Sequence, residues 1–169
     1  MYDELSNFEK TFALEGILMK KPNANKYLFS AIVGLNTFIF ECDGDSIYNE
    51  KFIYLSPAVY KSSDKRGQRP KLIDVQARYN VSPFVTNAYI YMSNRNVTVH
   101  NVFSNDVSDE LPYMYTSEIV AFSWNGEPCH KYILESPVRS FFVDDDDRVL
   151  YGVSVDSDGY DYILKYQLK

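Results

Sequence analysis

Basic side chains are concentrated between positions 61 and 71, although the whole chain has a formal charge of −6. They are Lys61, Lys65, Arg66, Arg69 and Lys71. Clustered lysine and arginine side chains attract anionic ligands such as phosphate, and a solvated loop is the alternative interpretation. No glycine-rich phosphate-binding fingerprint accompanies them, because Gly67 is isolated. We therefore take Lys65, Arg66 and Arg69 as candidate ligand-binding residues.

A second group of candidates lies between positions 93 and 116. Tyr113 and Tyr115 flank a methionine, and aromatic rings on an exposed loop can stack on a sugar or a peptide, or pack across the fold. His100 is one of only two histidines, and no nucleophile elbow or triad spacing accompanies it. The few histidines and cysteines also argue against a zinc site. We assign Tyr113, Tyr115 and His100 to ligand binding, and we predict no catalytic residue, metal site or cofactor.

Two acidic clusters could in principle hold a cation. Asp144 to Asp147 could supply oxygen ligands to Ca²⁺, but aspartates are also ordinary turn residues. Asp156-Ser157-Asp158-Gly159 is similar to the start of a calcium loop, yet Gln167 occupies the twelfth position, where that loop requires a glutamate. We interpret both clusters as turns, with a type I′ or related hairpin turn at Asp158-Gly159.

An internal repeat indicates the elements that must position these residues. Residues 37–57 read TFIFECDGDSIYNEKFIYLSP, and residues 118–137 read EIVAFSWNGEPCHKYILESP. Each copy runs an apolar strand into Asp43-Gly44 or Asn125-Gly126, which provide the positive φ angles of a primed hairpin turn. A hairpin repeated at long spacing is typical of β-repeat architectures, among them propellers. The predicted fold class is therefore all-β, built from β-propeller blades.

Composition agrees with this fold and excludes some functions. The chain has 169 residues, 15 of them tyrosine and 11 phenylalanine, which suit half-buried sheet surfaces. A pI near 4.9 argues against a general nucleic-acid-binding protein. No apolar run is long enough for a transmembrane segment, and the acidic start MYDELSNFEK lacks the features of a signal peptide. Cys42 and Cys129 hold different places in the repeat, so we predict two free thiols.

Apolar runs bounded by turn residues divide the chain into blades, each a four-stranded antiparallel meander. We predict three blades, with four as a weaker alternative. The predicted strands are 16–20, 27–33, 37–42 and 47–54 in the first blade, 72–80, 84–92, 117–124 and 128–134 in the second, and 138–143, 148–155 and 160–168 in the third. Residues 8–14 (FEKTFAL) resemble 49–55 (NEKFIYL) and are assigned to an outer strand. The prediction is one domain, residues 1–169, equivalent to half of a six-bladed propeller.

The second half of the chain resembles a known family. Residues 119–128 follow a hydrophobic-x-Phe-x-Trp-x-Gly-x-Pro pattern, and a Phe-Phe-Val strand, an acidic turn and Leu150-Tyr151-Gly152 come after it. In these features residues 27–169 resemble the C-terminal blades of TolB-like six-bladed propellers of Bacteroides-type bacteria. The resemblance implies six blades and a periplasmic or cell-surface location, with no established activity and no catalytic residues to carry over. The chain departs from that family in having about half its length and no export signal.

Loop parity predicts where a ligand would bind. The longest irregular segments are 57–71, which connects the first blade to the second, and 93–116, which connects two strands of the second blade. Connections in a meander alternate between its two faces, and these two fall on the same face. We expect this face to hold a small-molecule, glycan or protein ligand. The predicted function is that of a non-enzymatic binding or scaffold protein, and the alternative is a propeller-type lyase or hydrolase acting on a carbohydrate or peptide.

The strand order also predicts an assembly. The third blade ends with a strand at 160–168 whose Leu164, Tyr166 and Leu168 would form an unpaired apolar edge, which is a liability in a monomer. Residues 8–14 of a second copy could supply the missing outer strand. We therefore expect a homodimer that completes a six-bladed ring by exchanging these strands.

Overall fold

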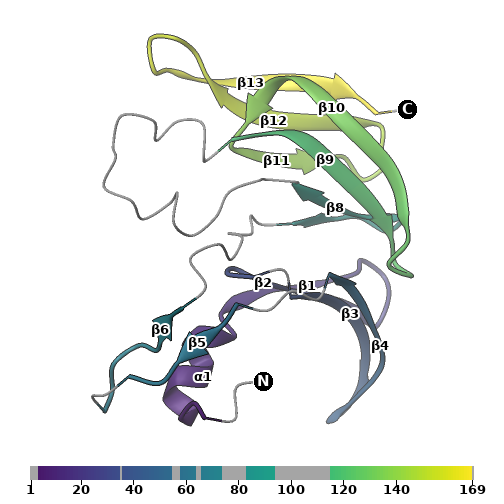
Figure 1. Cartoon of the computed structure of the whole chain (residues 1–169). Coiled ribbons are helices and arrows are strands. Elements are labelled where there is room, and N and C mark those ends of the chain that lie inside the picture. The colour runs from purple at the N-terminus through teal and green to yellow at the C-terminus, as the bar shows by residue number, and fades with distance from the viewer. Residues whose placement is uncertain are drawn as a thin grey trace.

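Antiparallel strands dominate the computed structural model, which describes residues 4–34, 36–54, 58–63, 66–73, 83–93 and 115–168 (Figure 1). The strands form two four-stranded sheets, one three-stranded sheet and one two-stranded hairpin. Each of the larger sheets is a meander in which strands adjacent in sequence are adjacent in space. The predicted all-β, blade-like fold class is therefore confirmed.

The first sheet follows the prediction closely. Its strands are β1 (Gly16–Lys20), β2 (Lys26–Ala31), β3 (Thr37–Asp43) and β4 (Ser46–Tyr54), in the order β1-β2-β3-β4. Along β2, Leu28 and Ser30 point to one face and are buried, whereas Phe29 points to the other face and is half-buried. This alternation is the period of two that a strand requires.

The second sheet differs from the prediction at its first strand. Its order is β10-β9-β8-β7, from β7 (Phe84–Val85), β8 (Tyr89–Ser93), β9 (Thr116–Ser123) and β10 (Pro128–Val138). The single strand predicted at 84–92 is wrong, because the chain reverses after Thr86, whose hydroxyl accepts a hydrogen bond from the backbone N–H of Tyr89 (3.1 Å). Such side-chain-to-backbone bonds favour turns over a continued strand. The strand predicted at 72–80 falls on β6 at Leu72, and residues 74–80 lie outside the described residues.

The third sheet has the order β11-β12-β13, from β11 (Ser140–Val143), β12 (Val149–Val155) and β13 (Asp161–Gln167), as predicted. Within the described residues β13 is the edge strand of this sheet and pairs only with β12, as predicted, while its Leu164, Tyr166 and Leu168 side chains pack inward against the core between the second and third sheets. Their inward direction follows from the pairing of buried Leu150 with Tyr166, which places both on one face.

The predicted outer strand at residues 8–14 is also wrong, because the chain forms helix α1 (Asn7–Ala13) there. The Ser6 side chain caps the first turn, and the Glu9 carboxylate accepts a hydrogen bond from the Ser6 backbone N–H (2.9 Å). Ser-x-x-Glu is a capping box, a helix signal that outweighs the weak likeness of FEKTFAL to a strand. The strand exchange built on this segment therefore has no basis.

The basic segment forms a short hairpin. β5 (Tyr60–Lys61) pairs with β6 (Lys71–Leu72), and α1 lies beside this hairpin (Figure 1). Ala58, Tyr60 and Leu72 pack with Val33, which anchors the hairpin next to the end of β2. The predicted common face of 57–71 and 93–116 stays a prediction, since residues 94–114 lie outside the described part of the chain.

The three larger sheets are stacked so that the second is enclosed by the other two. Even-numbered side chains of β8 and β9, such as Ile90 and Phe122, pack with Leu28 and Ile39 of the first sheet. Odd-numbered side chains of the same two strands pack toward the third sheet, in a cluster formed by Tyr91, Ile119 and Ala121 with Leu134 and Val138 of β10 and Val143 and Leu150 of the third sheet. One apolar cluster thus fills each junction between blades.

Glycine alone has a positive φ angle in the two repeated turns. Gly44 has φ of 58° and forms the two-residue loop with Asp45 between the paired Asp43 and Ser46, and Gly126 has φ of 80°. The expectation that the Asp and Asn would share this conformation was wrong. Glycine at the first loop position suits a type II′ turn in the first copy, whereas in the second copy Gly126 follows Trp124 and Asn125 in a longer loop, with its N–H donating to the carbonyl of Ser123 (2.9 Å).

Candidate ligand-binding site

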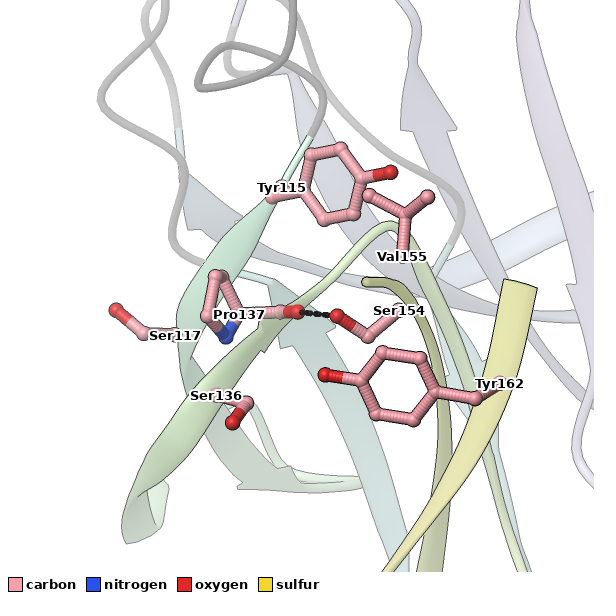
Figure 2. Close-up of a pocket in the computed structure, with 7 residues that line it drawn as sticks. All are labelled: Tyr115, Ser117, Ser136, Pro137, Ser154, Val155 and Tyr162. Carbon is pink, nitrogen blue, oxygen red and sulfur yellow. Dashed lines mark hydrogen bonds between the residues drawn. The ribbon is translucent and has the colours of Figure 1, made fainter. Parts of the chain in front are cut away.

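A cavity of about 460 Å³ opens where the second and third sheets meet (Figure 2). Its volume lies within the roughly 300–1,000 Å³ that is typical of small-molecule sites. The lining combines hydroxyl groups with apolar surface: Tyr115, Ser117, Ser136, Pro137, Ser154, Val155 and Tyr162. None of these side chains carries a formal charge at neutral pH.

Strand pairing brings the lining residues together from four segments. Thr116 of β9 pairs with Val138 of β10, which places the start of β9 beside the end of β10. Ser154 of β12 pairs with Tyr162 of β13, so their side chains share one face of the third sheet. Residues from two sheets therefore converge, although the sequence separates them by tens of positions.

Hydrogen bonds hold the wall between the sheets. The hydroxyl of buried Ser154 donates to the backbone carbonyl of Pro137 (2.7 Å), as Figure 2 shows. The hydroxyl of Tyr166 donates to the carbonyl of Ser136 (3.1 Å) and accepts from the N–H of the same residue (3.3 Å). These contacts fix the backbone at Ser136 and Pro137 against the third sheet.

The remaining hydroxyls of the cavity are free to meet a ligand. Within the described residues, the hydroxyls of Tyr115, Ser117, Ser136 and Tyr162 make no hydrogen bond to other side chains or to backbone. The ring of Tyr162 is 37% exposed, and its hydroxyl points toward Ser136 and Pro137 (Figure 2). A hydroxyl can both donate and accept, so this wall can satisfy either kind of polar group.

The structure separates the predicted site residues. Tyr115 lines the cavity between the sheets, whereas Arg66 lines another cavity of about 440 Å³ beside Ser6 and Glu9. Arg69 places its guanidinium 4.7 Å from the ring centroid of Phe12 and so helps to hold α1. Lys65, His100 and Tyr113 lie outside the described residues.

The anion bound at the basic hairpin belongs to the chain itself. The carboxylate of buried Glu9 accepts hydrogen bonds from the N–H of Ser63 (2.6 Å) and the hydroxyl of Ser62 (3.0 Å). The Ser63 backbone N–H, and then the N–H and hydroxyl of Ser6, lower the pKa of Glu9 from 4.5 to about 2. These contacts join α1 to the hairpin, and the basic segment contributes to an internal contact that sequence reasoning missed.

The Asp144–Asp147 cluster is a turn, as predicted, but one member has an additional contact. Asp147 has φ of 57°, and its Oδ1 accepts hydrogen bonds from the hydroxyls of Thr86 (2.7 Å) and Tyr91 (2.8 Å). Burial first, and then the Asp147 carboxylate, raise the pKa of the Tyr91 phenol. Trp124 extends the network by donating from Nε1 to the carbonyl of Thr86 (3.0 Å). Asp147 therefore ties the third sheet to the second.

The second acidic cluster is a hairpin loop. Gly159 has φ of 85°, and Oδ1 of Asp156 accepts hydrogen bonds from the N–H groups of Asp158 and Tyr160 (2.9 Å each). The predicted turn is present, with glycine as its one left-handed residue. Among the residues that the structure describes, no group of three histidine, cysteine or acidic side chains could hold a metal ion.

The two cysteines are free thiols, as predicted, with Cys129 exposed and Cys42 half-buried. No helix in the described residues is long and apolar enough to cross a membrane.

No family model matches the chain, and no curated protein matches its sequence. The resemblance to TolB-like propellers therefore stays a prediction.

Proposed function

We propose that this chain is a non-enzymatic binding protein of the propeller type, with its ligand site in the cavity between the second and third sheets. The observation that carries the proposal is the lining, in which four hydroxyl groups that have no hydrogen-bond partner among the described residues stand beside exposed aromatic and apolar surface. Such a combination recognises a ligand by hydrogen bonds and contact. Tyr115 belongs to the candidate residues named from sequence, and it connects that prediction to the cavity.

A screen by thermal shift tests the binding function. The probes are neutral sugars, short peptides, phosphorylated metabolites and divalent cations, each added to the intact chain. A ligand that binds only the folded state raises the melting temperature by mass action. We expect at least one class to do so, and Ser136→Ala to reduce its effect while leaving the melting temperature without ligand nearly unchanged. Hydrolysis or elimination of a bound sugar or peptide would instead favour the alternative, a propeller-type enzyme. A shift from none of the classes would overturn the proposal.

The proposal includes assembly as a homodimer with a six-bladed ring, the architecture that the TolB-like resemblance implies. Because residues 8–14 are helical, the contact would be made by sheet faces and not by exchanged strands. Exposed apolar side chains on the two end sheets support this arrangement: Leu18 and Phe52 on the first sheet, and Phe142 and Ile163 on the third. Apolar clusters fill both junctions within the chain, and a second copy would extend the same stacking.

Sedimentation equilibrium at low micromolar concentration tests the dimer. The expected mass is twice the 19.6 kDa of one chain. Phe52→Ser and Phe142→Ser should each shift the equilibrium to the monomer, because each removes apolar area from an end face. Tyr160→Ser, in the exposed loop before β13, is the matched control. A wild-type chain that stays monomeric would rule out the ring.

A further inference from the structure

The cavity between the second and third sheets has an apolar part and a hydroxyl part. The rings of Tyr115 and Tyr162, with Pro137 and Val155, provide the apolar surface, and the serines provide short polar groups. A pyranose ring has the matching division, with carbon-bound hydrogens on its faces and hydroxyls at its edge. Tyrosine suits such a ligand because it combines a flat apolar ring with a polar tip.

Charge distinguishes a neutral sugar from an anionic ligand at this site. The lining residues have no formal charge. Of the charged residues next to the lining in sequence, Glu118 forms an ion pair with Lys131 at 2.6 Å and Asp161 forms one with Arg139. The other two, Glu135 and Asp156, are acidic and would repel an anion. Among the described lining side chains a phosphate or carboxylate would find no cation to replace its hydration, and burying a charge without a partner is costly. A neutral polyhydroxyl ligand avoids this cost.

The wall of the cavity is also organised before a ligand arrives. Tyr166 fixes the backbone of Ser136 and Ser154 fixes that of Pro137, while the Ser136 hydroxyl makes no hydrogen bond within the described residues. A fixed backbone with an available hydroxyl reduces the entropy lost on binding. It also makes Ser136 a position where one polar group can be removed without breaking an internal contact.

We propose that this cavity binds an uncharged saccharide, with Tyr115 and Tyr162 contacting the sugar ring and Ser117 and Ser136 hydrogen-bonding its hydroxyls. The proposal rests on the binding function proposed above and names its ligand class. It concerns the described cavity only and does not involve the basic hairpin, where Glu9 already occupies the hydrogen-bond donors.

Calorimetric titration of the full chain with cellobiose, maltose, lactose, mannobiose and xylobiose tests the proposal, with glucose 6-phosphate as the anionic comparison. At least one neutral disaccharide should bind, and glucose 6-phosphate should not compete for its site. Tyr162→Ala should weaken binding about tenfold, because it removes the apolar ring surface that would contact the sugar. Ser136→Ala should weaken it roughly two- to tenfold, the range expected for one hydrogen bond.

Tyr160→Ala is the matched control, because Tyr160 stands two positions from Tyr162 and is 73% exposed outside the lining. It should leave the affinity unchanged. If Tyr162→Ala fails to fold, Ser136→Ala decides the matter, since the Ser136 hydroxyl has no partner to lose among the residues that the structure describes.

The ligand class and the binding function fail in different ways. Binding of an anion or a peptide in the thermal-shift screen, with no binding of any of the five disaccharides, overturns the saccharide and keeps the binding function. Absence of a shift from every class overturns both. Sugar binding that survives both Tyr162→Ala and Ser136→Ala overturns the assignment to this cavity.

Discussion

The hydrogen bonds to Asp147 should show strong coupling between the second and third sheets. Tyr91 is fully buried and donates its hydroxyl to Oδ1 of Asp147 at 2.8 Å, while Asp147 itself is half-buried. The informative pair of substitutions is Tyr91→Phe and Asp147→Gly. Glycine is the appropriate truncation, because Asp147 has φ of 57° and alanine would add the penalty of the left-handed conformation.

The two single changes should differ in size. Tyr91→Phe removes one of the two hydroxyl donors to Asp147, and water can replace it at a half-buried carboxylate, so we expect a loss of about 1–2 kcal/mol of unfolding free energy. Asp147→Gly leaves the Tyr91 hydroxyl buried without its acceptor and also removes the acceptor of Thr86, so we expect a loss of about 2–4 kcal/mol.

The double variant provides the test. Once Asp147 is glycine, Tyr91→Phe removes a hydroxyl that has lost its partner and should cost almost nothing. The coupling energy should therefore equal the loss in the Tyr91→Phe single variant, about 1–2 kcal/mol, measured by urea denaturation of the four proteins followed by tryptophan fluorescence. Asp146→Ala, an exposed neighbour in the same turn, should change stability by less than about 0.5 kcal/mol. Additive losses within about 0.5 kcal/mol would refute the contact between Tyr91 and Asp147.

Three further predictions follow from other contacts. Because the pKa of Glu9 is lowered to about 2 in the folded chain and is 4.5 without its partners, docking of α1 should weaken as the pH falls below 4.5. Hydrogen exchange in residues 7–13 should show this weakening in the wild type and in the control variant Glu4→Gln. An equal pH response in Glu9→Gln would contradict it. Because the pKa of the Tyr91 phenol is raised above 10.0 in the folded chain, the contribution of this phenol to stability should be lost as the pH rises above 10. Alkaline denaturation followed in the wild type and in Tyr91→Phe should show this loss only in the wild type, and the same pH dependence in both proteins would contradict it. Gly152→Ala should cost about 1–3 kcal/mol in urea denaturation, because the added Cβ would lie 2.4 Å from Cγ1 of buried Val138; a wild-type midpoint would show that the junction can expand.

Local signals made most of the fold predictable. Alternating apolar runs bounded by Gly44, Gly126 and Gly159 located eight of the longer strands to within a few residues, because glycine turns and a period of two are properties of short segments. The helix at the N-terminus was missed even though Ser6 and Glu9 stand at capping-box spacing. The likeness of FEKTFAL to NEKFIYL predicts a strand, but the capping box is the stronger of these two local signals.

The site was less predictable, because its parts come from separate strands. Tyr115 was identified as an aromatic residue in an irregular segment, but Ser136, Ser154 and Tyr162 have no feature in sequence that marks them. They converge only once β10, β12 and β13 take their register. Likewise, nothing near Asp147 indicated that it would accept hydrogen bonds from Thr86 and Tyr91, which lie more than fifty positions away.

The enclosure of the second sheet gives β9 a property that matters for any variation of this chain. Side chains at neighbouring positions on this strand pack into different junctions: Ile119 and Ala121 pack toward the third sheet, and Val120 and Phe122 pack toward the first. A substitution at one of them acts on one junction, and the next residue along acts on the other. Substitutions at alternate positions of β9 could therefore change the packing of one outer sheet, by selection or by design, while the side chains at the opposite junction stay the same.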